Sequence, residues 1–228
     1  MKNHDDNMNG EIKIRRANRD DLSFIAWVIY EATRGHLQEG SSDCVLSNLL
    51  EKNSEDDIIE FFQNLATTDQ IHYGHISKFW VAEYEGEVAG AMSSFSPEEG
   101  DIDMFKEAVT TVIDNLKTEK NIKGLEDWLS KFDLDYPEDD QEAWGIEMVA
   151  VLPEFRGLGI TDLLFQKIFH EARKAGYNKV QIGCIIGNKA AEKAYKRNGF
   201  SVIEEYRDPE YSKLMGSPGF KIMEKRLS

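Results

Sequence analysis

The clearest chemical signal in the chain is a short loop that follows an apolar strand and leads directly into a helix. The loop consists of Arg156, Gly157, Leu158, Gly159, Ile160 and Thr161. The first turn of a helix exposes unpaired backbone N–H groups and carries a partial positive charge. Glycines let a phosphate approach the backbone closely, and Arg156 adds a cation. The pattern predicts an anion-binding site, and a tight strand-to-helix turn without a ligand is the alternative.

Two other phosphate-binding motifs do not fit the sequence. A dinucleotide fingerprint needs GxGxxG, but Asp162 stands where the third glycine belongs. A mononucleotide P-loop needs GxxxxGK followed by Ser or Thr. Residues 183–189 have the wrong spacing, and no hydroxyl residue follows Lys189.

The loop resembles the acyl-CoA pyrophosphate loop of the GNAT superfamily of N-acetyltransferases, R/Q-x-x-G-x-G/A. The preceding residues 151–155 match the V-x-P-E-x end of the family's apolar strand, whereas Thr161 replaces Gly or Ala at the sixth loop position. Further along, residues 188–200 resemble the family's N-x-x-A-x-x-x-Y-x-x-x-G-F motif. The two motifs stand in the family's order, so the chain is identified as a GNAT-like protein.

The resemblance implies acetyl-CoA as co-substrate, with acetyl rather than a longer acyl group as the family default. Two neighbouring parallel strands, 144–151 and 179–185, are expected to splay apart and to hold the pantetheine arm between them. Free backbone groups of Val149 and Val151 would pair with this arm like an added strand. The N–H of Val149 would polarise the thioester carbonyl.

The same resemblance assigns the remaining cofactor contacts to the two motifs. The amides of residues 157–161, with Arg156, would hold the pyrophosphate. Asn188 would bond the pantetheine arm, and Ala191 of the second motif belongs to the same expected cofactor site.

Tyr195 matches the tyrosine that family members often use as general acid. A phenol near the sulfur can protonate the leaving thiolate. Packing in the core is the alternative for a tyrosine on an amphipathic helix.

Glu147 is the best candidate for the base that deprotonates the amine. It lies in an otherwise apolar strand, and a period of two predicts that it shares one face with Val149 and Val151. General-base catalysis, amine binding and an unrelated salt bridge all remain open for this residue. Glu142 and His75 are weaker candidates for the base.

Hydrophobic periodicity and turn residues predict the elements that must position these side chains. Asp20 is the expected N-cap of the first helix. The expected strands are 11–17, 79–84 and 87–94 (a hairpin), 144–151, 179–185, 200–206 and 219–226. The expected helices are 21–36, 56–66, 102–116, 125–132, 159–175 and 188–197. The predicted fold class is α/β (α+β), with a GNAT-like mixed, mostly antiparallel central sheet flanked by helices.

Residues 96–142 form an acidic block between the hairpin and the 144–151 strand. Its apolar positions at helical spacing predict a helical insertion, which is too short for a robust core of its own. The expectation is therefore a lead-in of residues 1–10, predicted to be disordered, and one domain over 11–228. The insertion either gates the acceptor cleft in favour of cations or is a solvated cap.

Composition excludes several other classes. The formal net charge of −15 repels a nucleic-acid backbone, so no nucleic-acid partner is expected. No apolar run is long enough to span a bilayer, and residues 1–10 lack the apolar core of a secretory signal, so the expected location is cytoplasmic. Cys44 and Cys184 are expected to be reduced thiols, and the histidines show no metal-binding spacing, so no metal is expected.

These observations predict an enzyme, an N-acetyltransferase that moves the acetyl group of acetyl-CoA to a primary amine of a small molecule or peptide by direct attack. Two alternatives stay open: a catalytically silent acyl-CoA-binding sensor, and an acetyltransferase of a basic protein partner. The family includes monomers and homodimers, and the sequence does not decide between them.

Overall fold

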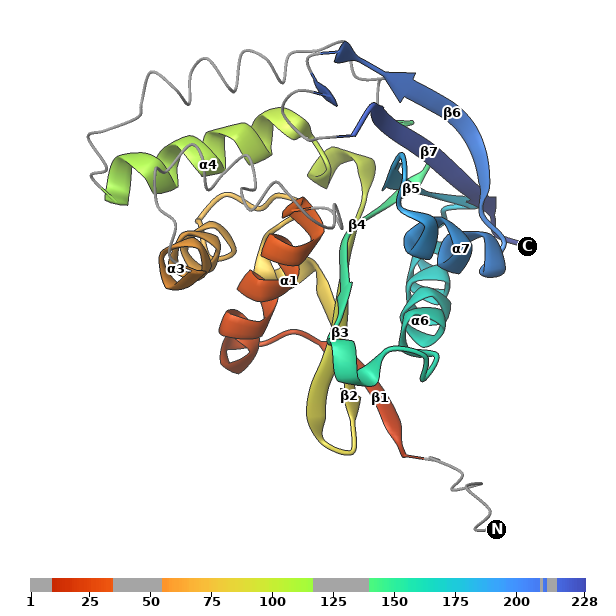
Figure 1. Cartoon of the computed structure of the whole chain (residues 1–228), viewed down its shortest axis with the longest axis horizontal. Coiled ribbons are helices and arrows are strands. Elements are labelled where there is room, and N and C mark those ends of the chain that lie inside the picture. The colour runs from red at the N-terminus through yellow and green to blue at the C-terminus, as the bar shows by residue number, and fades with distance from the viewer. Residues whose placement is uncertain (1–9, 35–54, 117–139, 210, 213–216) are drawn as a thin grey trace.

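The computed structural model describes residues 10–34, 55–116, 140–209, 211–212 and 217–228, and these form one seven-stranded sheet in the order β1-β2-β3-β4-β5-β7-β6 (Figure 1). The strands are β1 (Ile12–Arg16), β2 (Phe79–Tyr84), β3 (Glu87–Phe95), β4 (Trp144–Val151), β5 (Lys179–Ile185), β6 (Ser201–Arg207) and β7 (Gly219–Arg226). Only β4 and β5 run parallel, and every other neighbouring pair is antiparallel. The predicted mixed, mostly antiparallel sheet is confirmed.

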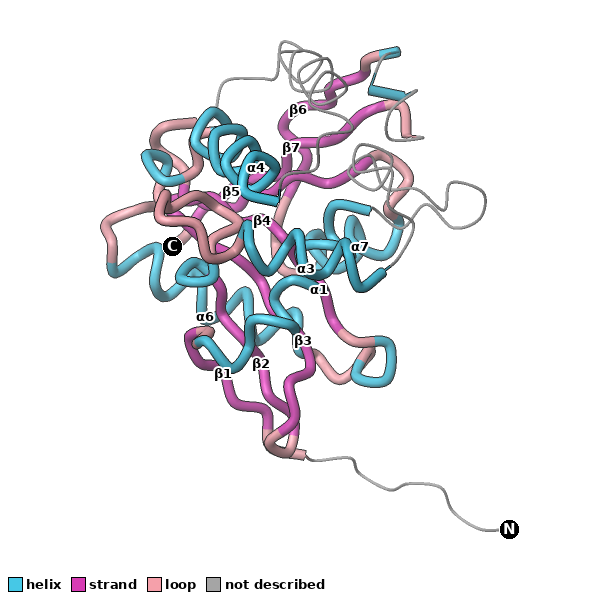
Figure 2. The backbone as a smooth tube through the Cα atoms, turned by 90° about the vertical axis from the view of Figure 1, so that its left-hand side faces the viewer, coloured by secondary structure: helices cyan, strands magenta, loops and turns pink. Residues whose placement is uncertain are grey.

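Helices cover both faces of this sheet, so each face has its own apolar core (Figure 1, Figure 2). One face, named here the α1 face, is covered by α1 (Leu22–Arg34), α3 (Glu55–Leu65) and α4 (Ile102–Leu116). The other, named the α6 face, is covered by α6 (Ile160–Lys174) and α7 (Lys189–Arg197). Short 3-10 turns precede α1, β2, α4 and α6. A strand residue therefore contributes to one core or the other according to the face on which it lies.

The helix predicted over 102–116 in the acidic block is α4, and it belongs to the core of the α1 face. Phe105, Val109 and Val112 are buried against α1 and α3, while Asp103 and Glu107 are exposed. This amphipathic pattern explains how a charge-rich segment can pack on the domain. The predicted helix 125–132 lies outside the described residues, as do all but one of the residues predicted as a lead-in.

The first helix begins differently from the prediction. Asn18, not Asp20, is the N-cap: its side chain accepts the Asp20 N–H at 2.8 Å, and the Asp21 carboxylate accepts the Asn18 N–H at 2.8 Å. The prediction was wrong because a 3-10 turn over Arg19–Asp21 comes before α1 and moves the capping position back by two residues.

β4 contains a β-bulge at its centre. Ser93 of β3 pairs with Glu147, but Ala91 pairs with Ala150, so Met148 and Val149 together stand opposite one residue of β3. Met148 has a φ of +49°, which is uncommon for a residue other than glycine. The bulge interrupts the alternation of side chains along β4 and decides which face each of them reaches.

Candidate active site

The site is built around an opening in the sheet between β4 and β5. The two strands pair only from Trp144 and Val180 to Ile146 and Ile182, and they separate beyond that point. The predicted splay is therefore present, at the position predicted for it.

Backbone groups of β4 face this opening. The Leu152 N–H donates to Ala89 of β3 at 2.9 Å, so by strand alternation the polar backbone groups of Val151 and Val149 point the other way, toward β5. The Val151 carbonyl accepts a hydrogen bond from Arg156 Nε at 3.1 Å. The two valines predicted to meet a pantetheine arm thus present their backbone where no strand pairs with them.

The loop between β4 and α6 supplies a row of unpaired amides. Gly157 and Gly159 have φ values of +88° and +80°, and a Cβ at either position would meet nothing within 4 Å. Glycine is favoured here by the backbone conformation, and the space in front of the loop is open. Within the described part of the chain, no protein group accepts a hydrogen bond from the amides of residues 157–161. Because α6 begins at Ile160, these amides and the helix dipole point at the same space.

Thr161 and Asp162 form the first turn of α6. Thr161 is half-buried, and Asp162 is bound by Arg197 at 2.7 Å and by the Asn198 side chain at 2.6 Å. Burial of the Asp162 carboxyl acts to raise its pKa, but these two hydrogen bonds outweigh burial and lower the pKa. The negative charge near the anion-binding loop is therefore offset by Arg197.

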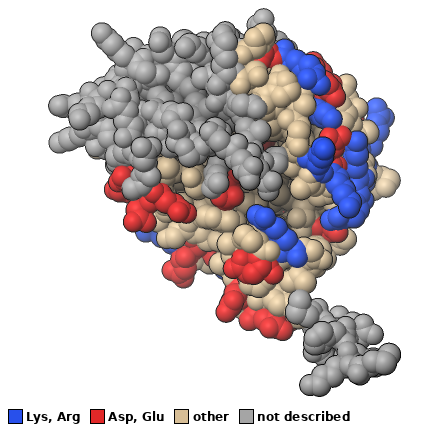
Figure 3. Space-filling model, viewed as in Figure 1, with Lys and Arg blue, Asp and Glu red and all other residues tan. Residues whose placement is uncertain are grey.

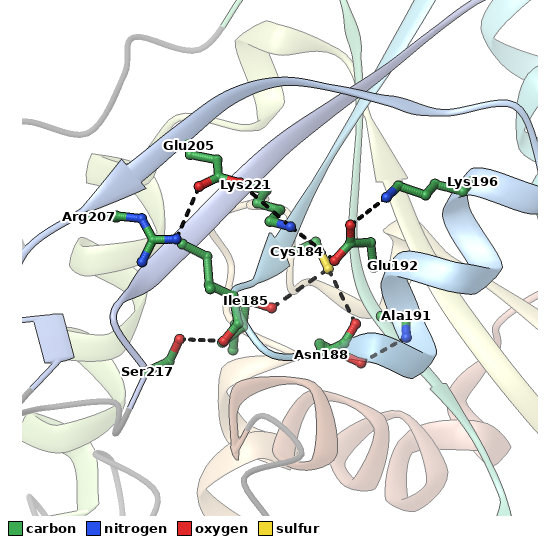
Figure 4. Close-up of polar contacts among 11 residues, drawn as sticks. Cys184, Ile185, Asn188, Ala191, Glu192, Lys196, Glu205, Arg207, Ser217 and Lys221 are labelled. Atoms are coloured by element: carbon green, nitrogen blue, oxygen red, sulfur yellow. Dashed lines mark hydrogen bonds and ion pairs between the residues drawn. The ribbon is translucent and has the colours of Figure 1, made fainter.

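The second motif forms the start of α7. Asn188 is the N-cap, and its side-chain oxygen accepts the Ala191 N–H at 2.8 Å (Figure 4). The cap occupies one of the two acceptor positions of this oxygen, so the side-chain NH₂ of Asn188 is its remaining donor toward a ligand. A chain of ion pairs joins this helix to the neighbouring strands: Glu192 contacts Lys196 at 2.6 Å and Lys221 at 3.0 Å (Figure 4).

Tyr195 points from α7 into the core of the α6 face. Its side chain is 6% exposed, and its ring lies 5.6 Å from that of Phe165 in an edge-on contact. Burial, with smaller contributions from Cys184 and Glu147, raises the pKa of the Tyr195 phenol well above its ordinary value. The hydroxyl therefore keeps its proton at neutral pH. Both readings of Tyr195, packing and proton donation, are compatible with this position.

Glu147 does not share a face with Val149 and Val151, so that prediction was wrong. Ile146, Val149 and Val151 all pack in the core of the α6 face, whereas Met148 and Ala150 pack in the core of the α1 face. Glu147 follows Ile146 directly, before the bulge, and so points toward the α1 face. A bulge adds one residue and reverses the alternation, which a simple period of two cannot anticipate.

The weaker candidates have local structural partners. Glu142 lies 3.3 Å from Lys179 Nζ and is exposed. His75 is the N-cap of a 3-10 turn, and its Nδ1 accepts the Ser77 N–H at 3.2 Å. Burial, followed by the nearby charge of Lys78, lowers the pKa of His75.

Cys184 of β5, predicted to be a reduced thiol, is free and buried, 3.8 Å from the Ile185 carbonyl, and burial raises its pKa to about 11 (Figure 4). Sequence reasoning missed Gly183, which lies beside Glu147, since a Cβ built on it would be 3.2 Å from Glu147 Oε1. A glycine within a strand is the signal that could have revealed the close approach.

The described residues contain no group of three or more His, Cys, Asp or Glu side chains that could hold a metal ion. None of the helices in the described ranges has the length and apolar character needed to cross a bilayer.

Comparisons with known proteins agree with this architecture. The model of the Acetyltransferase (GNAT) family matches residues 46–200. No curated protein sequence matches the chain significantly. Among solved structures, one described as an acetyltransferase superposes with a TM-score of 0.65 at 19% identity, covering 95% of this chain and 100% of that one. An N-acetyltransferase from Staphylococcus aureus Mu50 gives 0.65 at 20% identity, covering 93% and 100%. A GCN5-related N-acetyltransferase from Kribbella flavida gives 0.51 at 15% identity, covering 95% and 98%.

At these identities the solved structures establish the fold, and the family model extends over more than half of the chain. The chain therefore belongs to the GNAT family of acetyltransferases and is an acetyl-transferring enzyme.

Proposed function

We propose that this enzyme transfers the acetyl group of acetyl-CoA to a primary amine by direct attack at the opening between β4 and β5. The observation that carries the proposal is the opening itself. The unpaired amides of residues 157–161 lie at the N-terminus of α6, beside this opening. Tyr195 lies on the α6 face of the sheet, and Glu147 points toward the α1 face. The donor and the amine can thus approach one gap from the two sides of the sheet.

The α6 face suits the acyl donor. The amides of residues 157–161 and Arg156 hold the pyrophosphate, whose charge favours a helix N-terminus. The pantetheine arm lies along β4 and pairs with the backbone of Val149 and Val151. The Val149 N–H then polarises the thioester carbonyl. Asn188 contributes its side-chain NH₂, and Ala191 lines the arm from the first turn of α7.

In the reaction, the amine nitrogen attacks the thioester carbonyl carbon and a C–N bond forms. The tetrahedral intermediate collapses as the C–S bond breaks, which yields the amide and a CoA thiolate. Tyr195 donates its phenolic proton to the departing sulfur as negative charge develops there. Glu147, directly or through a water molecule, takes the proton that the attacking amine must lose.

Acetyl-CoA binding is tested first by thermal unfolding with and without acetyl-CoA, beside free CoA. A ligand that binds only the folded state at about 100 times its Kd adds roughly 2.7 kcal/mol of stability. The second arm follows thiol release with a panel of primary amines. A shift in Tm with steady thiol release supports the proposal. Binding without amine-dependent release would leave a silent acyl-CoA sensor, and the absence of any shift would refute acetyl-CoA as the donor.

A second candidate, acetylation of a basic protein, is favoured by the charge distribution. Acidic side chains gather on the part of the molecule that carries α1 and α3, whereas Lys and Arg gather near α6, α7 and the β6–β7 hairpin (Figure 3). The exposed acidic residues of α3 and α4 are Glu55, Asp56, Glu60, Asp103, Glu107 and Asp114. A protein acceptor docking there would lose affinity as salt rises, because exposed charges are screened beyond a Debye length of about 8 Å at 0.15 M salt. A salt-independent KM for the acceptor favours a small amine.

A further inference from the structure

Gly183 lies at the first position of β5 beyond the paired part of the β4–β5 ladder. The last pair is Ile146 with Ile182, so Glu147 and Gly183 are the next residues on the two strands. Gly183 still pairs with Ile222 on its other side, so its backbone is fixed by β7. The glycine is therefore held rigidly at the point where the sheet begins to open.

The missing side chain of Gly183 leaves a gap toward the α1 face. Ile182 and Cys184 both pack in the core of the α6 face, so a Cβ at position 183 would point the opposite way. That Cβ would lie 3.2 Å from Glu147 Oε1, and apart from its chain neighbours no other atom of the described residues would lie within 4 Å. The Glu147 carboxylate therefore bounds the gap in this direction, and between it and the Gly183 backbone there is room for about one methyl-sized group.

We propose that this gap receives the reacting amine and that Gly183 limits the size of the group attached to it. The inference rests on the proposed function and adds the class of acceptor, a primary amine on an unbranched carbon. An ammonium or amine nitrogen that contacts Glu147 fills the space that a methyl group at position 183 would take. A branch on the carbon that bears the nitrogen needs additional room at the same place.

The glycine is not required by backbone strain. Its φ lies outside the left-handed region, unlike the φ of Gly187 in the following turn, at +103°. An alanine at position 183 would press on the far end of a flexible carboxylate, which can move by a few tenths of an ångström. The Gly183→Ala variant should therefore fold and bind acetyl-CoA, which makes it a usable probe of the gap.

The experiment compares n-butylamine with its branched isomer sec-butylamine, since both carry one primary amine and differ only in branching. The wild type should have a kcat/KM about tenfold or more higher for n-butylamine, the size of effect expected for one extra carbon in a fitted pocket. Gly183→Ala should raise the KM for n-butylamine about tenfold and leave the Kd for acetyl-CoA unchanged.

The matched control is Gly74→Ala. A Cβ there also meets its nearest atom at 3.2 Å, the Cε1 of His72, but its neighbours are His72 and Phe105 rather than Glu147. The control should keep the wild-type KM and selectivity, and urea unfolding of both variants reports any loss of stability.

Four outcomes would overturn the inference. They are an unchanged KM in Gly183→Ala, an equal rise in KM in Gly74→Ala, equal use of the two amines by the wild type, and transfer to neither amine by a wild type that binds acetyl-CoA. The proposed function stands in the first three cases. A wild type that fails to bind acetyl-CoA would refute the proposed function and, with it, this inference.

Discussion

The two faces of the sheet are built in different ways around the same opening. On the α6 face, the loop of residues 156–161, the start of α7 and Tyr195 lie in two short segments, each with its own turn chemistry. On the α1 face, Glu147 and Gly183 come from separate strands and meet only because both strands belong to one sheet. In the proposed function, local motifs hold the acyl donor, whereas tertiary contacts between strands form the side from which the acceptor approaches.

The two faces also differ in their ionisable side chains and in how deeply these are buried. The described residues of the α6 face contain no buried histidine, but His72 is fully buried beside the core of the α1 face. The basic residues near α7 form exposed or half-buried ion pairs, such as those of Glu192 (Figure 4). Each difference leads to an experiment that acts on one face and leaves the other unchanged.

The largest effect is expected from Gly159→Asp on the α6 face. The substitution places a carboxylate in front of unpaired amides at a φ of +80°, where a side chain is strained. Loss of two charge-assisted hydrogen bonds predicts that the Kd for acetyl-CoA rises roughly 1000-fold, or about 4 kcal/mol. Isothermal titration measures the Kd.

Gly86→Asp is the matched control for this variant. Gly86 lies in the β2–β3 turn at a φ of +89° and also has open space around a built Cβ. Strain and charge are thus similar, but Gly86 does not belong to the loop of residues 156–161, and its amide is not one of the unpaired amides of that loop. A Kd that stays near the wild-type value in Gly159→Asp would remove that loop from the binding site.

The next effect concerns His72, beside the core of the α1 face, and the pH dependence of the free energy of unfolding. His72 accepts the Gly74 N–H at 3.1 Å, and burial lowers its pKa from 6.5 to about 4. In the unfolded chain the imidazole takes up a proton near pH 6.5, so between pH 6.5 and 4 the unfolded state binds more protons. The free energy of unfolding should therefore fall as the pH falls through this window, by about 3 kcal/mol in total.

Urea unfolding at several pH values tests this expectation against His72→Gln. The variant has no imidazole to protonate and should lose this part of the pH dependence, whatever its stability at pH 7. Identical slopes of stability against pH in the two proteins would show that His72 does not titrate as described.

A smaller effect is expected from Tyr195→Phe. The change removes one hydroxyl from a side chain that is 6% exposed and keeps the ring contacts with Phe165. Loss of the general acid should lower kcat about tenfold or more, and the Kd for acetyl-CoA should stay nearly constant. Stopped-flow measurement of thiol release gives kcat. An unchanged kcat would leave Tyr195 with a packing role alone.

The smallest effect concerns the two ion pairs of Glu192, one within α7 and one that joins α7 to β7. Lys221 and Lys196 both contact Glu192, but the Lys221 side chain is 15% exposed and that of Lys196 is 56% exposed. Lys221→Met should lower the free energy of unfolding by up to about 1 kcal/mol, because the partly buried Lys221–Glu192 pair is screened less by solvent than an exposed pair. Lys196→Met should have almost no effect. Equal losses in urea unfolding would mean that burial does not distinguish the two pairs.

Much of the fold was predictable because its signals are local. The β2–β3 hairpin has the predicted two-residue turn, with Glu85 at a φ of +52° and Gly86 at +89°. β4 and β7 have the predicted bounds, α6 is one residue shorter than predicted at each end, and α7 is one residue shorter at its start. The N-cap of the first helix was misplaced because Asn18 and Asp20 are both good caps, and only the observed 3-10 turn distinguishes them.

The sequence by itself determined the α6 face of the site. Glycines at positive φ, an Asn cap and a tyrosine two turns later act through neighbouring residues, so their spacing already specifies the geometry. Tertiary structure alone decided the α1 face. Glu147 turns away from Val149 because β3 pairs across a bulge, and Gly183 meets Glu147 because β4 and β5 separate after three pairs. Strand pairing joins residues that are far apart in the chain, and a local period of two carries no information about where that pairing slips.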